Sequence, residues 1–111
     1  MDIKSIKEFK GISIYGGEVI GKVLIFNNKV IKINNKEKII LVVPAITPDL
    51  VIYFNSIKAL ISEIGSALSH GSILAREYGL PTIILENATQ LFKDEHLIKM
   101  NAYLGKVKII N

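Results

Sequence analysis

The sequence predicts a mixed α/β domain rich in β-strands, on three observations. Isoleucine is the commonest residue, at 21 of 111 positions, and its β-branched side chain suits the pleated surface of a sheet. Apolar runs are short and are separated by Gly, Asn and Pro, which favour turns. Two strand-then-helix patterns follow one another in the second half, as in α/β proteins. Half of the residues are hydrophobic and 22% are charged, which excludes a disordered chain and favours a single domain over residues 1–111.

The first half of the chain is typical of successive strands. Residues 11–17 alternate briefly and end in a glycine pair, which predicts a strand and a turn. A longer strand is expected over 18–26, with Gly21 inside it as a candidate bulge. A short strand is expected over 30–33. The run 39–43 (IILVV) is apolar without alternation, as in a strand buried on both faces.

The second half alternates helices and strands. Thr47, Pro48 and Asp49 are typical of an N-cap, a first helical position and a first-turn acid, which predicts a helix to about Asn55. The remaining expected elements are a strand over 58–64, a helix over 70–78 between Ser69 as N-cap and Gly79 as stop, a strand over 82–85, a short helix or turn over 88–92, and strands over 97–100 and 106–110.

Composition excludes several kinds of site. There is no cysteine, so disulfides, thiolate nucleophiles and cysteine-ligated metals are excluded. His70 and His96 lie far apart without metal-ligand spacing, so no metal site is expected, and His96 is interpreted as a surface or edge residue. The first residues mix Asp, Lys and Glu, unlike a signal peptide, and the longest apolar run, 39–46, is far shorter than the roughly 20 residues that span a bilayer. We therefore expect a cytoplasmic protein without a membrane partner.

The positive charge is spread along the chain. Thirteen lysines and one arginine against ten acidic residues give a net charge of +4. The lysines occur in scattered pairs such as Lys106/Lys108 and are not interleaved with aromatic residues, as they often are in nucleic-acid-binding proteins. We interpret them as solvated residues on the polar faces of strands and expect no nucleic-acid partner.

The segment 65–81 (GSALSHGSILAREYGLP) combines features that suit phosphoryl transfer. A strand is expected to end near Gly65, a loop of small residues follows, and His70 opens the next helix. The first N–H groups of a helix lack intrahelical acceptors and carry the positive end of its dipole, so such an end binds anions. The same positive end disfavours the imidazolium form and leaves a neutral ring nitrogen free to attack phosphorus. His70 is therefore the candidate phosphoryl acceptor.

The neighbours of His70 are small or polar. The residues expected to stabilise a phosphate are Gly65, Ser69, Gly71 and Ser72. Arg76 is the single arginine, and two roles stay open for it: support of a phosphate on His70, or pairing with a carboxylate such as Glu77 or Asp49. Ile73, Leu74 and Tyr78 lie at helical spacing and are expected to contact the core.

This segment resembles the signature of the mobile, or phosphohistidine, domain of phosphoenolpyruvate (PEP)-utilising enzymes. That family includes pyruvate phosphate dikinase, phosphoenolpyruvate synthase and enzyme I of the sugar phosphotransferase system. The positions that match its motif are Gly65, Ser69, His70, Ile73, Ala75, Arg76, Glu77, Gly79 and Pro81. The resemblance extends to residues 11–23 at the start of the chain, to the Thr47-Pro48-Asp49 helix start, and to residues 87–89 and 105–107.

The resemblance implies a swivelling β/β/α fold with two or three short helices. It also implies that His70 is transiently phosphorylated and carries the phosphoryl group between two distant active sites. Family members join this domain to an ATP-grasp nucleotide-binding domain and a PEP/pyruvate-binding barrel, where Mg²⁺ acts with ATP or PEP. The 111 residues hold neither, so the implied protein is a phosphotransferase subunit that binds no cofactor itself and works with partner chains.

Two positions depart from the family motif and keep an alternative open. Ser66 replaces a glycine, and Leu68 replaces the threonine two residues before the histidine, which removes a hydroxyl that could bond the phosphate or the imidazole. These changes favour a non-catalytic docking or regulatory module with the same fold, whereas the intact Ser69-His70 pair favours the carrier. A third interpretation, a basic nucleic-acid-binding β-domain, rests only on the pI of about 9.3.

Overall fold

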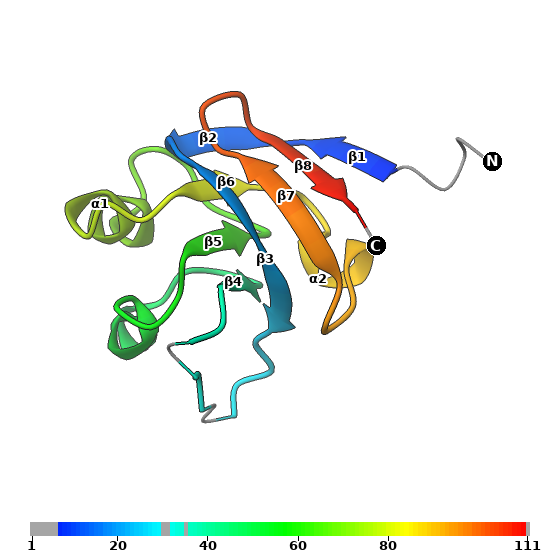
Figure 1. Cartoon of the computed structure of the whole chain (residues 1–111). Coiled ribbons are helices and arrows are strands. Elements are labelled where there is room, and N and C mark those ends of the chain that lie inside the picture. The colour runs from blue at the N-terminus through cyan, green and yellow to red at the C-terminus, as the bar shows by residue number, and fades with distance from the viewer. Residues whose placement is uncertain (1–6, 30–31, 35, 111) are drawn as a thin grey trace, which may run out of the picture.

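The computed structural model describes residues 7–29, 32–34 and 36–110, and their strands form one eight-stranded mixed sheet (Figure 1). The strands are β1 (Lys7–Lys10), β2 (Ile12–Tyr15), β3 (Glu18–Ile25), β4 (Ile39–Val43), β5 (Ala59–Ser62), β6 (Thr82–Ile84), β7 (Leu97–Asn101) and β8 (Lys106–Ile109). The helices of this part of the chain are the 3-10 helix η2 (Pro48–Tyr53), α1 (His70–Glu77) and α2 (Ala88–Leu91). The predicted class, α/β and rich in strands with two or three short helices, is confirmed.

The centre of the sheet is parallel and buried on both faces. The strand order is β1-β8-β7-β3-β4-β5-β6-β2, and β3, β4, β5 and β6 run parallel to one another. All five residues of β4 are buried. Ile40 and Val42 point into one core cluster, and Ile39, Leu41 and Val43 into another. This is why the run 39–43 is apolar without alternation.

The sheet curls, because consecutive strands lie at its two ends. β1 pairs antiparallel with β8, and β2, which follows directly, pairs antiparallel with β6 at the other end of the order. The Gly11 N–H between them donates to the Gly105 carbonyl at 2.7 Å. Inside the curl, Phe9 of β1 meets Phe92 edge-on with ring centroids 5.6 Å apart. The first core cluster fills this space, and α2 contributes Ala88 to it.

Helices η2 and α1 cover the second core cluster. Leu50 and Tyr53 of η2 and Ala75 of α1 are buried against the inward side chains of β4. Figure 1 shows α1 on the side of the molecule away from α2. The loop 63–69 therefore leads from the end of β5 to the start of α1, beside the carboxyl ends of the parallel strands.

The long strand differs from its prediction at Gly21. Its pairing is continuous through this residue on the β7 side, and the register shift lies instead in β2, between Ser13 and Tyr15. Gly21 is required by space, because a Cβ there would lie 2.7 Å from the Lys38 carbonyl oxygen.

Three other expectations change. Residues 30 and 31 of the strand expected over 30–33 lie outside the described residues, and residues 32 and 33 are not in a strand. The helix after Thr47 is a 3-10 helix that ends at Tyr53, and the Thr47 side chain makes no capping hydrogen bond. β1 was not predicted, because its apolar content is one residue, Phe9, and its pairing with β8 is remote in sequence. Over the described residues, no helix is long and apolar enough to cross a membrane.

Candidate functional site

Three serines shape the loop that leads into α1. Ser69 has the extended backbone of an N-cap residue, as predicted, but its hydroxyl makes no capping bond to the helix. The Ser69 Oγ lies 2.8 Å from the Ser66 carbonyl oxygen and 2.9 Å from the Ser72 Oγ. The Ser66 hydroxyl accepts the Leu68 N–H at 3.3 Å. The serine hydroxyls therefore hold the loop against the helix, and the first helical N–H groups are left to other acceptors.

His70 stands at the first position of α1 and is exposed. Within the described part of the chain, its side chain has no hydrogen-bond or ion-pair partner, and the backbone N–H groups of His70, Gly71 and Ser72 have no acceptor. An exposed imidazole thus lies beside unpaired N–H donors at the positive end of a helix. This arrangement can hold an anion next to a nucleophilic nitrogen.

Two positions of the predicted site, 65 and 71, require glycine for structural reasons. Gly71 is buried against Ile46: a Cβ at Gly71 would lie 2.5 Å from the Ile46 Cβ and 2.6 Å from the Ile46 carbonyl oxygen. Gly65 has φ +143°, a backbone conformation that residues other than glycine rarely adopt. It lets the chain turn after β5. Gly71 therefore fixes the helix start on the protein body, and a contribution of either glycine to phosphate binding stays a prediction.

Ser72 is fully buried, and its hydroxyl faces Ser69. Because the whole residue is buried, Ser72 does not meet a ligand that approaches from solvent and acts on it only through its contact with Ser69. The residues predicted to stabilise a phosphate therefore lie close together, but they differ in exposure. Ser69 is partly exposed, whereas Ser72 is buried and supports Ser69 from beneath.

Arg76 links the helix to the loop. Its Nη2 donates to the Ala67 carbonyl at 2.7 Å. Among the described residues, neither Glu77 nor Asp49 forms an ion pair with it, so the carboxylate pairing, one of the two roles left open for Arg76, is not found; support of a phosphate stays a prediction. In this structure the side chain steadies the turn that precedes His70.

Apolar side chains around the site are more exposed than predicted. Leu68 is 86% exposed and Ile64 65%. Leu74 packs on the second core cluster, as expected of the helix, but Ile73 is 39% exposed. Tyr78 meets Phe54 edge-on yet is 46% exposed. The surface around His70 therefore combines exposed apolar side chains with the exposed guanidinium of Arg76.

Glu63 is a polar contact that sequence analysis missed. Its Oε2 accepts the backbone N–H of Thr89 at 2.9 Å and the Thr89 hydroxyl at 2.6 Å. A carboxylate from the end of β5 thus binds an N–H in the first turn of α2, where negative charge is favourable. The two residues are remote in sequence, so no local pattern indicates the pairing.

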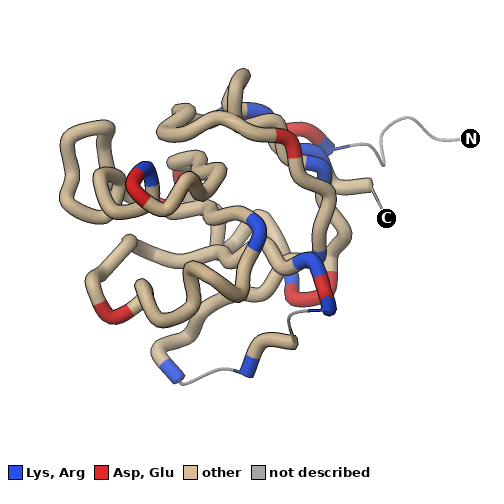
Figure 2. Tube along the Cα trace, turned by 60° about the vertical axis from the view of Figure 1, so that its left-hand side comes forward, with Lys and Arg blue, Asp and Glu red and all other residues tan. Residues whose placement is uncertain are grey.

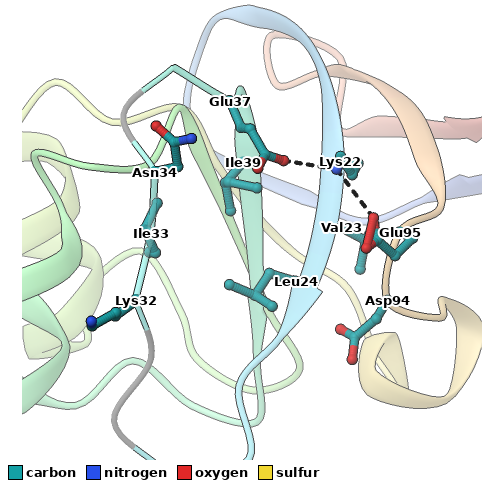
Figure 3. A pocket seen from close by; sticks show the side chains of 10 residues that line it. All are labelled: Lys22, Val23, Leu24, Lys32, Ile33, Asn34, Glu37, Ile39, Asp94 and Glu95. Atoms are coloured by element: carbon teal, nitrogen blue, oxygen red, sulfur yellow. Dashed lines mark ion pairs between the residues drawn. The ribbon is translucent and has the colours of Figure 1, made fainter.

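A second polar region surrounds Lys22 (Figure 3). The Lys22 Nζ lies 2.7 Å from Glu37 Oε2 and 3.1 Å from Glu95 Oε1, and the hydrogen bond to Glu37, followed by that to Glu95, raises the pKa of Lys22 above its usual 10.5. The Asp94 carboxylate accepts the Ile25 N–H at 2.7 Å. A cavity of about 270 Å³ is lined by Lys22, Val23, Leu24, Lys32, Ile33, Asn34, Glu37, Ile39, Asp94 and Glu95.

The described residues contain no group of three or more His, Asp or Glu side chains placed to hold a metal ion. His96, interpreted from the sequence as a surface or edge residue, is partly buried in the neighbouring turn, and its Nδ1 accepts the Lys93 N–H at 3.1 Å.

The fold and the site together define a strand-rich α/β domain that presents a histidine at the start of a helix. Residues 35–105 match the family of PEP-utilising enzyme mobile domains, and the chain belongs to this family. The resemblance stated from the sequence is confirmed.

Relatives in this family are much longer proteins. A rifampicin phosphotransferase of Bacillus cereus is 35% identical over 101 residues, which are 90% of this chain and 12% of that protein. A rifampicin phosphotransferase of Bacillus subtilis is 41% identical over 71 residues, 63% of this chain and 8% of that protein. The chain thus corresponds to about a tenth of the length of these relatives.

Solved structures with low sequence identity share the fold. A chain of aconitase X from Thermococcus kodakaraensis superimposes with a TM-score of 0.70 at 18% identity, covering 95% of this chain and 99% of that chain. A UPF0107 protein solved by NMR gives a TM-score of 0.66 at 18% identity, covering 95% of this chain and all of the other. At this identity the likeness concerns the fold alone.

Proposed function

We propose that this chain is a phosphoryl-carrier domain whose His70 is transiently phosphorylated. The observation that carries the proposal is the exposed imidazole of His70 at the start of α1, where neither the imidazole nor the first backbone N–H groups have a partner among the described residues. Membership of the PEP-utilising mobile-domain family and the phosphotransferase names of its relatives support it.

In the first step, a ring nitrogen of neutral His70 attacks the phosphorus of the donor with its lone pair. A nitrogen–phosphorus bond forms as the phosphorus–oxygen bond of the donor breaks, and the leaving oxygen keeps that electron pair. The exposed start of α1, where the His70 N–H has no acceptor among the described residues, is placed to bond the phosphoryl oxygens, and the helix dipole favours their negative charge. The Ser69 hydroxyl would become a further donor only by giving up its hydrogen bond to the Ser66 carbonyl.

In the second step, an oxygen of the acceptor attacks the same phosphorus. The nitrogen–phosphorus bond breaks, its electron pair returns to the imidazole, and His70 is regenerated. The chain itself contributes the acceptor nitrogen and the anion-binding helix start. We place the nucleotide site, of ATP-grasp type, and the PEP/pyruvate-binding barrel, both with their Mg²⁺, on partner domains or chains.

Phosphorylation of the isolated chain tests the histidine without partners. Potassium phosphoramidate, a small phosphoryl donor, is expected to place acid-labile, base-stable phosphate on the wild type and on His96→Ala, but not on His70→Ala. His96 is the matched control because it is the other histidine of the chain. Equal labelling of wild type and His70→Ala would contradict the proposal.

Transfer from a biological donor tests the carrier role. In host extract with labelled PEP, or with ATP labelled at the β-phosphate, wild type is expected to acquire acid-labile label and His70→Ala none. If neither protein is labelled in an extract that phosphorylates a known acceptor, the domain is a docking or regulatory module. The 86% exposed Leu68 beside the histidine is the feature that would serve such docking.

A further inference from the structure

The outward face of the antiparallel strands gathers lysines that are scattered in the sequence. Across β1, β8, β7 and β3, the register aligns two outward rows of residues. One row is Glu8, Lys108, Lys99 and Ile20, and the other is Lys10, Lys106, Asn101 and Glu18. We call Lys10, Lys99, Lys106 and Lys108 the lysine cluster. In Figure 2 the strands near the two termini carry several charged positions close together.

Like charges face each other in this cluster. Lys99 lies directly opposite Lys108, and Lys10 directly opposite Lys106. Like charges at opposed cross-strand positions destabilise a sheet. Within the described part of the chain, none of the four lysines forms an ion pair with a carboxylate. Glu8 lies opposite Lys108 in the register, and the rest of the cluster's positive charge has no ion-pair partner among the described residues.

The surroundings of the cluster indicate the kind of anion that fits. A shallow cavity of about 210 Å³ lies over Lys99, Asn101, Lys106 and Lys108. Glu8 and Glu18 border it on both sides and limit the extent of the positive surface, which suits a partner with a few separate carboxylates better than a long, continuous phosphate backbone. Exposed apolar side chains lie beside it: Ile20 is 48% and Ile110 41% exposed. Mixed charge with neighbouring apolar groups is typical of protein interfaces.

We propose that the lysine cluster is a docking surface for an acidic protein surface, one whose carboxylates neutralise the opposed lysine pairs. The repulsion inside each pair falls when a carboxylate binds between its members, so binding is coupled to relief of an unfavourable interaction already present. The cluster lies on the antiparallel strands, and His70 lies at the start of α1 on another part of the surface (Figure 1). Docking there leaves His70 accessible.

A short poly-L-glutamate peptide is the probe for this surface, with binding followed by NMR amide shifts at low salt. Amides of β1, β7 and β8 are expected to shift. Lys99→Glu/Lys106→Glu, which reverses one member of each opposed pair, is expected to weaken binding by roughly tenfold or more. Lys29→Glu/Lys58→Glu is the matched control, because both lysines are exposed outside the cluster and the change in net charge is the same. His70→Ala is expected to bind as wild type does, so this test is separate from that of phosphorylation.

Three outcomes would overturn the docking surface. Equal weakening by the two double variants would show that only the overall charge matters. Shifts spread over the whole surface would show the same. Tighter binding of an oligothymidylate of equal formal charge would assign the cluster to nucleic acid. Loss of binding through unfolding is controlled by the melting temperature of Lys99→Glu/Lys106→Glu, which is expected to equal or exceed that of wild type because each repulsive pair becomes attractive.

Discussion

The helix start at His70 and the cavity at Lys22 are two polar regions of one molecule, held in opposite ways. At Lys22, opposite charges from three segments satisfy one another at 2.7 and 3.1 Å. At His70, neutral serine hydroxyls and Arg76 hold the loop, while the imidazole and the first helical N–H groups have no partner among the described residues. The region at Lys22 thus has a cavity and a lysine whose pKa is raised by its ion pairs. The region at His70 is instead distinguished by polar groups without partners among the described residues.

A change that moves the start of α1 is expected to have the largest effect on the region at His70 and none on the region at Lys22. Gly71→Ala places a methyl group 2.5 Å from the Ile46 Cβ, so α1 must shift away from the body of the protein. We expect a loss of about 2 kcal/mol in the free energy of unfolding, as for an overpacked core, together with slower phosphorylation of His70. Urea denaturation and the rate of labelling by phosphoramidate measure the two effects.

Gly79→Ala is the control at the other end of α1. Its φ of +63° also favours glycine, but the nearest heavy atom to an added Cβ is the Tyr15 Oη at 3.9 Å. The expected loss is about 1 kcal/mol, from the backbone conformation alone, with the labelling rate unchanged. If Gly71→Ala were no more destabilising than Gly79→Ala, the contact with Ile46 would not fix the helix start.

Loosening the loop without moving the helix has a smaller expected effect. Arg76→Ala removes the hydrogen bond to the Ala67 carbonyl, so the turn before His70 gains freedom. Phosphorylation of His70 is expected to slow by roughly tenfold, with little change in melting temperature, because Arg76 is exposed. Initial rates of labelling measure this.

Arg76→Lys tests whether Arg76 acts by holding the loop through its hydrogen bond to the Ala67 carbonyl. A lysine can still donate to the Ala67 carbonyl, so we expect it to recover part of the lost rate. A labelling rate for Arg76→Ala equal to that of wild type would mean that the clamp on the loop does not matter for His70.

The smallest expected effect concerns Lys22. Because Glu37 and Glu95 raise the pKa of Lys22 in the folded state, its stabilising effect is present below pH 10.5 and is lost as pH rises through the higher folded value. Lys22→Met is therefore expected to lower the melting temperature slightly at neutral pH, and high salt should remove most of the difference. Melting curves at neutral pH and at about pH 11 measure the effect.

Phosphorylation separates the two regions most directly. Lys22→Met is expected to label at His70 at the wild-type rate, since Lys22 lies in β3 and not in the loop or helix at His70. Slower labelling would show that the two regions are coupled, which would break the contrast drawn above.

Much of the secondary structure and the location of the site follow from local patterns. The buried run 39–43, the helix that begins at His70 and the turn at Gly79 were predicted because burial on both faces, helix starts and left-handed glycines leave marks within a few residues. The edge strand β1 was missed, since it forms by pairing with β8 at the far end of the chain. Gly71 was expected to stabilise a phosphate, which stays a prediction, and its contact with Ile46 adds a packing role that spacing does not reveal.

The sequence by itself determined the strand-rich class, the family and the position of His70 at a helix start, because these depend on neighbours along the chain. Only the tertiary structure decided which distant groups meet. It brought Glu63 to Thr89, placed Lys22 between Glu37 and Glu95, and set Lys99 opposite Lys108. Such partners are tens of residues apart or on strands whose register is set by the whole sheet. Their pairing is therefore a property of the packed sheet and leaves no periodic signal in the sequence.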